Sequence, residues 1–224
     1  MKNLKVLLLT FTVVLATTFS TVSAQEEASS PVSVGADFVS TYVWRGTAYS
    51  GPSIQPYVDF TFGGFSIGAW GSQGYDGFQE MDLYLSYGFD FGLSLGLTDY
   101  YYPGTPFLEF GDTISSHAFE INAGYEIGGF TIGANYILND ASSGAGSAGG
   151  DMYFEAGYSF SNWGLFVGAG DGWHTTDGDF GLCNVGISAS KDVEVTDKFT
   201  LPVFGSVSLN PESEQFYIVA GISF

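Results

Sequence analysis

The chain has 224 residues, and its 24 acidic side chains outnumber 5 basic ones, so the formal net charge is −19. Nucleic acid needs Lys and Arg against its phosphates, and anionic lipid surfaces also attract basic patches, so this charge argues against both partners. Glycine (32), phenylalanine (21) and tyrosine (14) are abundant and long helical periodicity is absent, which favours an all-β protein.

The N-terminus has the pattern of a secretory signal peptide. Lys2 and Lys5 precede an apolar stretch from Val6 to Leu15, and the small-residue site Val22-Ser23-Ala24 follows. We therefore expect residues 1–24 to be a signal peptide, residues 25–31 a short periplasmic segment and residues 32–224 the folded domain.

Beyond the signal peptide, no apolar run approaches the roughly 20 residues that a membrane helix needs. In hydrocarbon every backbone N–H and C=O must be paired within the protein, so strands can cross a membrane only as a closed sheet. Alternation of apolar and polar residues predicts twelve strands: they lie near 34–44, 54–62, 65–69, 81–87, 91–97, 119–125 and 130–136, and then begin near Asp151, Trp163, Phe180, Phe199 and Gln215. The sequence thus predicts a transmembrane antiparallel up-and-down β-barrel.

The apolar parity of each strand is expected to face lipid. In the first strand this parity includes Phe38, Tyr42 and Trp44, and Cys183 falls on the same parity of a later strand. Aromatic residues near strand ends are typical of interfacial girdles. We expect this role for Tyr42, Trp44, Trp163 and the run 100–102.

Tight periplasmic turns should alternate with longer outer loops in such a barrel. Tight turns are predicted at 63–64, 88–90, 128–129 and 161–162, and longer loops at 46–52, 72–77, 103–115, 139–150 and 171–179. Residues 190–198 break the pattern, because a long segment stands where a short turn is expected.

The last nine residues alternate without a break and end on the apolar residue Phe224. With an even strand count, both termini lie on the periplasmic side. We expect this closing strand to engage the barrel assembly machinery of a Gram-negative bacterium and the barrel to sit in outer-membrane lipid.

Four segments carry a resemblance to a known family: D-F-V-S-T-Y-V-W-R-G (Asp37 to Gly46), M-D-L-Y-L-S-Y-G (Met81 to Gly88), D-Y-Y-Y-P-G (Asp99 to Gly104) and F-E-I-N-A-G-Y (Phe119 to Tyr125). In these segments the chain resembles the TorF family of porins. The resemblance covers nearly all of the mature chain. It implies an outer-membrane barrel of porin type and supplies no catalytic residues.

Function should then reside in the barrel interior. The inward parity collects these expected pore-lining residues: Asp37, Arg45, Asp59, Glu80, Asp82, Glu120, Glu126 and Glu155. The carboxylates predict a narrow channel for passive diffusion of small polar solutes that favours cations, or simply the polar interior of any such barrel. Arg45 is expected to be the structural partner of a lumen carboxylate. No metal or other cofactor is expected.

Other readings stay open. An outer-membrane hydrolase would need a Ser–His or Asp–His cluster, and Ser116 beside His117 is the nearest candidate, although adjacent strand residues point to opposite faces. A structural or receptor barrel without conductance and a secreted soluble sandwich are also compatible with the pattern. Asp171, His174, Asp177 and Asp179 could ligate a cation, although acidic turns are usually solvated.

Overall fold

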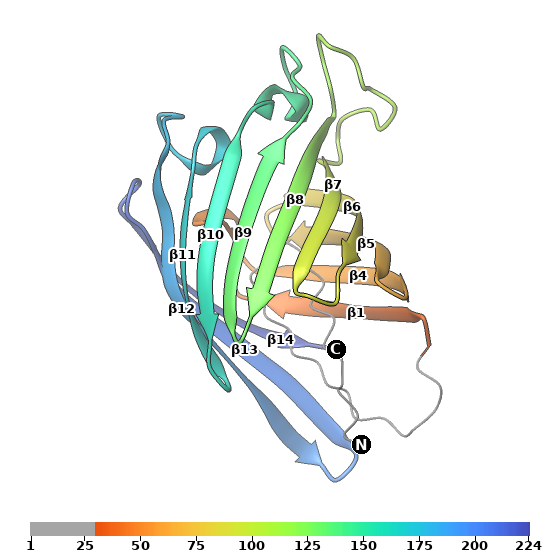
Figure 1. Ribbon diagram of the computed structural model, residues 1–224, viewed down its shortest axis with the longest axis vertical. Coiled ribbons are helices and arrows are strands. Elements are labelled where there is room, and N and C mark those ends of the chain that lie inside the picture. Colours follow the sequence, from red (N-terminus) through yellow and green to blue (C-terminus); the bar gives the residue numbers. More distant parts are fainter. Residues whose placement is uncertain (1–29) are drawn as a thin grey trace.

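The computed structural model describes residues 30–224, so the expected signal peptide lies outside the described residues, as does most of the segment 25–31. Twelve antiparallel strands form a closed barrel (Figure 1). In chain order they are β1 (Val32–Val39), β4 (Ser53–Phe62), β5 (Phe65–Gly74), β6 (Gln79–Gly88), β7 (Leu93–Tyr101), β8 (His117–Ile127), β9 (Phe130–Ile137), β10 (Met152–Ser159), β11 (Trp163–Gly170), β12 (Gly181–Thr196), β13 (Phe199–Asn210) and β14 (Gln215–Ser223). The predicted fold and strand number are confirmed.

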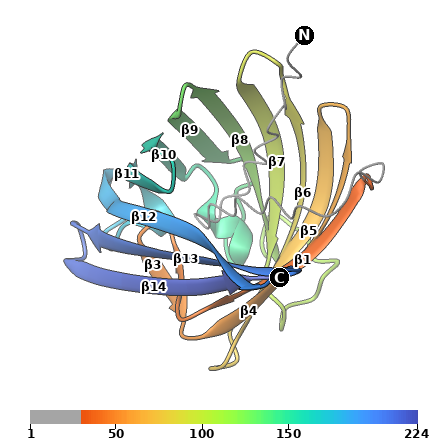
Figure 2. The same ribbon diagram turned by 90° about the horizontal axis from the view of Figure 1, so that it is seen from below.

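Strand neighbours in the barrel follow chain order, and β1 pairs with both β4 and β14 to close the ring. The β1–β14 seam is short, with three register pairs that run from Asp37↔Ser223 to Val39↔Gly221. After Ser40 the chain turns away from the barrel wall, so residues 215–219 of β14 have no β1 partner. Figure 2 shows this junction beside the C-terminus.

Alternate residues of the strands are sorted between two environments. On β4, for example, Ser53, Gln55, Tyr57 and Asp59 are buried or half-buried while the residues between them are exposed. The exposed parity around the barrel is apolar, and it includes Phe38, Ile54, Val58, Ile67, Leu85, Ile121, Ile132, Leu165, Val207 and Ile218. Because a pleated strand points successive side chains to opposite faces, the barrel has an apolar outside and a polar inside.

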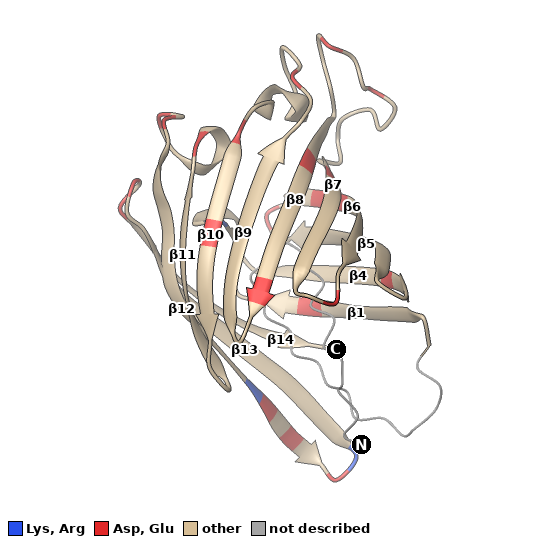
Figure 3. Cartoon of the chain, viewed as in Figure 1, with Lys and Arg blue, Asp and Glu red and all other residues tan. Residues whose placement is uncertain are grey.

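Short and longer connections alternate as expected, with one exception: the expected loop 72–77 is only the connection 75–78, which is as short as the β6–β7 turn at 89–92. Tight turns join β4 to β5, β6 to β7, β8 to β9 and β10 to β11, and the other end of the barrel carries the longer loops. Residues 190–196, expected as a long loop, instead continue β12, so the turn to β13 is only residues 197–198. This extension projects past the barrel rim and carries Lys191, Asp192 and Glu194, and Lys198 lies in the turn at its end (Figure 3).

Helical structure in residues 30–224 amounts to two short 3₁₀ turns, η1 (Ala145–Ala148) and η2 (Gly172–His174), both in longer loops. Within that range no helix has the length and apolar character required to cross a membrane. Gly144 and Gly149 flank η1 and Gly146 lies within it, so this glycine-rich segment is a loop element.

Candidate functional site

A small hairpin, β2 (Tyr42–Trp44) with β3 (Thr47–Ser50), forms a separate two-stranded sheet. Its turn is made by Arg45 and Gly46, which both have positive φ (49° and 83°). Two-residue hairpin turns of type I′ need positive φ at both central positions, because this twist matches that of the flanking strands. The segment between β1 and β4 therefore folds back on itself instead of extending β1.

The hairpin lies across the barrel interior. At its base, Tyr42 packs on Trp70 of β5, with ring centroids 5.5 Å apart. Towards its tip, Trp44 packs on Tyr100 of β7 at 5.5 Å, and Asn210 of β13 donates a 3.0 Å hydrogen bond to the carbonyl of Gly46. We call residues 42–50 the plug hairpin, because they bridge walls that face each other across the lumen.

The expectation that Tyr42 and Trp44 face lipid as girdle residues is wrong. Tyr42 is 3% exposed and Trp44 is 4% exposed, and both belong to the interior aromatic cluster, which also contains Tyr100. Their apolar parity continues that of β1, but the chain turns inward at Ser40–Thr41, so the same alternation serves a different environment. Trp163, by contrast, is 41% exposed and stacks on Phe160, as a girdle residue would.

Arg45 at the plug hairpin tip is held by charge and by aromatic rings. Its Nη1 and Nη2 donate to the two carboxylate oxygens of Glu120 on β8, at 2.6 and 2.9 Å. Its guanidinium carbon lies 4.4 Å from the Trp44 ring centroid and 4.5 Å from that of Tyr153 on β10. Bidentate pairing and stacking are what the planar guanidinium does best, and both partners here are buried.

Glu120 is itself fully bonded. Tyr100 Oη donates to Glu120 Oε2 at 2.9 Å, and Asn122 Nδ2 donates to the same oxygen at 2.6 Å. A buried ion pair gains most when its remaining lone pairs are also satisfied, so this network fixes the plug hairpin tip against β7 and β8. The expectation that Arg45 partners a lumen carboxylate is confirmed.

Gly46 makes the closest approach of the plug hairpin to the wall. A Cβ at this position would lie 1.9 Å from the carbonyl oxygen of Cys183 on β12. Glycine is thus required here both by positive φ and by contact with the wall backbone.

Cys183 does not face lipid, contrary to expectation, because it is fully buried. The register between β11 and β12 shifts at this point, pairing Gly168 with Asn184 but Ala169 with Leu182. A bulge inserts one residue and reverses the parity that sequence alternation implies.

His174 of η2 sits against the same site. Its Nε2 lies 3.4 Å from Arg45 Nη1, and its ring centroid lies 5.2 Å from that of Trp44. Burial first, and the neighbouring guanidinium second, lower the pKa of His174 to about 2. The imidazole is therefore neutral at physiological pH, and a loop segment contributes to holding Arg45.

The remaining expected pore-lining residues occupy the inward parity but do not form one cluster. Tyr84 Oη donates to Asp59 at 2.6 Å, and Tyr153 Oη donates to Glu155 at 2.6 Å. Glu126 lies at the turn end of β8, opposite Thr131. Their part in permeation stays a prediction.

Three buried lumen carboxylates are only partly satisfied. Within residues 30–224, one oxygen each of Asp37, Glu80 and Asp82 is enclosed and has no hydrogen-bond partner. Glu80 and Asp82 lie on β6 opposite Ser72 and Trp70 of β5. The interior thus keeps carboxylate oxygens that other protein groups leave unpaired.

His117 is built into the wall and does not pair with a serine hydroxyl. Its Nδ1 lies 2.8 Å from Asp99 Oδ1, and its Nε2 lies 2.6 Å from the carbonyl oxygen of Phe107. Ser115 Oγ bonds to the His117 backbone and accepts a hydrogen bond from Asn139 Nδ2, and Ser116 Oγ has no partner in the described chain. A ring with both nitrogens facing acceptors has no position left to accept a serine proton.

The 171–179 loop uses its polar groups locally. Asp171 accepts a hydrogen bond from the backbone N–H of Met152, and Asp177 accepts one from that of Asp179. Over residues 30–224, no group of three or more His, Cys, Asp or Glu side chains is arranged to hold a metal ion.

The sequence did not single out several residues of the Arg45 site as partners. Tyr100 was expected in a girdle and His174 in a solvated loop. For Asn122, Tyr153 and Asn210, the sequence predicted no contact with the hairpin. The signal available was Arg45-Gly46, a pair suited to a tight turn, which stands between two short segments that each carry aromatic residues.

No curated protein matches the chain. Among solved structures, one engineered double mutant of the Rhodopseudomonas blastica porin is similar with a TM-score of 0.45 and 16% identity, over 88% of this chain and 74% of that one. A triple mutant of the same porin is similar with a TM-score of 0.44 and 15% identity over the same shares.

The resemblance to the TorF porins stays a prediction, because no comparison carries that name. A family model described as a bacterial protein of unknown function matches residues 24–197. That span contains β1, the plug hairpin and the carboxylates of β4 to β10. The chain therefore belongs to the Gcw_chp family.

Proposed function

We propose that this protein is an outer-membrane channel whose own plug hairpin narrows the lumen, and that it passes small polar solutes and favours cations. The observation that carries the proposal is the sorting of side chains around a closed barrel. Apolar residues cover the outside and carboxylates line the inside. A bilayer outside and water inside are the surroundings that suit this arrangement.

The charge of the lumen supports a preference for cations. Arg45 is committed to Glu120, so its charge is already compensated. Among the described residues, the other expected pore-lining carboxylates have no Lys or Arg partner. Rings of Asp and Glu attract cations and repel anions at close quarters, where screening by salt is weakest.

The plug hairpin supports a second candidate, a barrel that serves as a receptor or structural element without conductance. Its contacts with β5, β7, β8 and β13 span the lumen. The two functions differ in whether ions cross the protein when the hairpin is docked.

Reconstitution in planar bilayers tests the proposal. In a salt gradient the wild-type protein should give small conductances with a reversal potential of the cation-selective sign. Glu80→Gln with Asp82→Asn should move that potential towards zero. Glu194→Gln, on the projecting β12 extension, is the matched control and should leave the potential unchanged.

Anion selectivity would contradict the role of the lumen carboxylates. If neither the wild type nor a variant with an undocked hairpin conducts, the channel proposal is wrong and the non-conducting barrel is favoured.

A further inference from the structure

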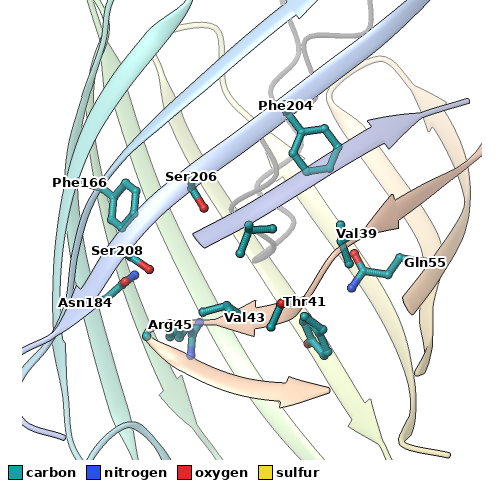
Figure 4. A pocket seen from close by; sticks show the side chains of 13 residues that line it. Val39, Thr41, Val43, Arg45, Gln55, Phe166, Asn184, Phe204, Ser206 and Ser208 are labelled. Carbon is teal, nitrogen blue, oxygen red and sulfur yellow. The ribbon is translucent and has the colours of Figure 1, made fainter. Parts of the chain in front are cut away.

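A small, partly open cavity lies between the plug hairpin and the wall formed by β12, β13 and β14. Its volume is about 40 Å³, and Figure 4 shows side chains from the hairpin and the wall converging on it. β2 and β3 pair only with each other. No ladder of backbone hydrogen bonds therefore joins β2 to β14 on this side of the hairpin. The polar groups around the cavity belong to Arg45, Gln55, Asn184, Ser206 and Ser208.

Two of these lining residues carry buried polar atoms without a partner in the described chain. Gln55 is 1% exposed, and its Nε2 donates to Ser53 Oγ at 3.3 Å, while its Oε1 is unpaired. Arg45 is 5% exposed and uses both Nη atoms on Glu120, while its Nε is unpaired. Buried polar groups are ordinarily satisfied, so a free acceptor and a free donor on one cavity point to an occupant that offers both.

The rest of the lining restricts the chemistry of that occupant. No Asp or Glu lines the cavity in residues 30–224, and the Arg45 charge is neutralised by Glu120. Hydroxyl and amide groups of Ser206, Ser208 and Asn184 supply further bonding positions, and the rings of Phe166 and Phe204 supply apolar surface. An uncharged molecule that carries both hydroxyl groups and C–H surface fits such a lining.

The volume limits the size. One water-sized group needs about 10–15 Å³ of such space, so the cavity holds roughly three. A three-carbon polyol, with one hydroxyl group on each carbon, is the largest that comes near this size. We propose that the cavity is a binding subsite for a small uncharged polyol. Such polyols would be one class of solute for the channel proposed above. Only this role in transport rests on the channel proposal.

Current measurements through the full-length protein in planar bilayers test the subsite. Glycerol is added to both sides and compared with betaine, a zwitterion of similar size that offers no hydrogen-bond donor. Glycerol should reduce the potassium current along a saturating curve, because a bound molecule occupies the level of the plug hairpin. Betaine should reduce it only in proportion to viscosity.

Two variants remove bonding positions without adding bulk. Gln55→Leu should raise the half-blocking glycerol concentration about three- to tenfold, the effect of one lost hydrogen bond. The double variant Ser206→Ala with Ser208→Ala should act in the same direction and keeps the inference testable if Gln55→Leu does not fold. Ser86→Ala is the matched control, since Ser86 lies on β6 in register with Ser66 and Gly96, away from the cavity.

A linear response that is the same for glycerol and betaine would overturn the inference and leave a cavity that holds water only. Failure of the channel proposal is distinguishable, because it shows as no current before any polyol is added. In that case saturation-transfer NMR with glycerol on the full chain in detergent decides the subsite by itself. A signal lost in Gln55→Leu supports the subsite, and the absence of a signal in the wild type refutes it.

Discussion

Gly46→Ala is the sharpest perturbation of the plug hairpin. The new methyl carbon would lie 1.9 Å from the carbonyl oxygen of Cys183, whereas real Cβ atoms essentially never come within 3.0 Å of a neighbour. The blocking atom is the backbone carbonyl of the bulged residue of β12, whose neighbours Leu182 and Asn184 are both paired with β11, so it cannot swing aside as the end of a flexible side chain could. The hairpin tip must therefore move by about 1 Å or more away from β12.

A displacement of that size is larger than the tip contacts tolerate. The Arg45–Glu120 bonds of 2.6 and 2.9 Å and the Asn210 bond to Gly46 share this tip. Breaking a buried ion pair costs about 3–5 kcal/mol, and every 1.4 kcal/mol is a factor of ten. The docked hairpin should thus lose roughly two to three orders of magnitude in its population relative to undocked states.

Single-channel conductance of Gly46→Ala should accordingly exceed that of the wild type, while heat-modifiable gel migration still shows a folded barrel. Gly63→Ala is the control, because Gly63 also has positive φ (60°) but a Cβ there meets nothing within 4 Å. Gly63→Ala therefore introduces the backbone strain of positive φ without a steric clash between Cβ and a neighbouring strand. If Gly46→Ala conducts like the wild type and like Gly63→Ala, the hairpin does not obstruct the lumen and the reasoning fails.

Three further changes have defined outcomes. Because the pKa of His174 is lowered to about 2 in the folded protein against 6.5 unfolded, its contribution to stability is complete above about pH 6.5 and declines as the pH falls. The free energy of unfolding should drop by about 2 kcal/mol more between pH 7.5 and 5 in the wild type than in His174→Gln, and equal drops in a denaturant titration would contradict this origin. Glu120→Gln should destabilise the protein more than Arg45→Met with Glu120→Leu, since the double change leaves no uncompensated charge, and the reverse order of denaturation midpoints would refute the pairing argument. His117→Phe should speed proteolysis in the 103–116 loop, which His117 ties down at Phe107, and an unchanged cleavage rate would show that the loop is held elsewhere.

The alternation of apolar and polar residues was enough to predict most of the fold, because each wall strand has an apolar surrounding on one face and a polar one on the other. A clean example is β4, where burial changes at every residue and the expected parity is the observed one. The same rule placed the carboxylates of β6 and β8 inside. Turn chemistry added most loop positions, and the 190–198 segment contains the expected short turn once residues 190–196 are assigned to β12, although residues 191–196 are exposed on both faces.

The plug hairpin escaped prediction for a physical reason. Alternation reports which residues share a face and says nothing about what covers that face, so Tyr42 and Trp44 fit lipid or an aromatic interior equally well. Cys183 escaped because a one-residue bulge is silent in the pattern and reverses every assignment beyond it. Partners of Arg45 from β8, β10 and η2 are distant in sequence, and only closure of the barrel brings them together.

The attachment of the plug hairpin determines how far it can travel. Both of its ends are fixed in neighbouring wall strands, since Val39 and Ser53 face each other as one register pair of β1 and β4. The plug hairpin can therefore move only as a hinged loop, because both of its ends stay attached to the barrel wall. Loop and hinge displacements of this kind occur within microseconds to milliseconds. Recordings from the protein should therefore show rapid flicker between unequal current levels, with no long silent intervals.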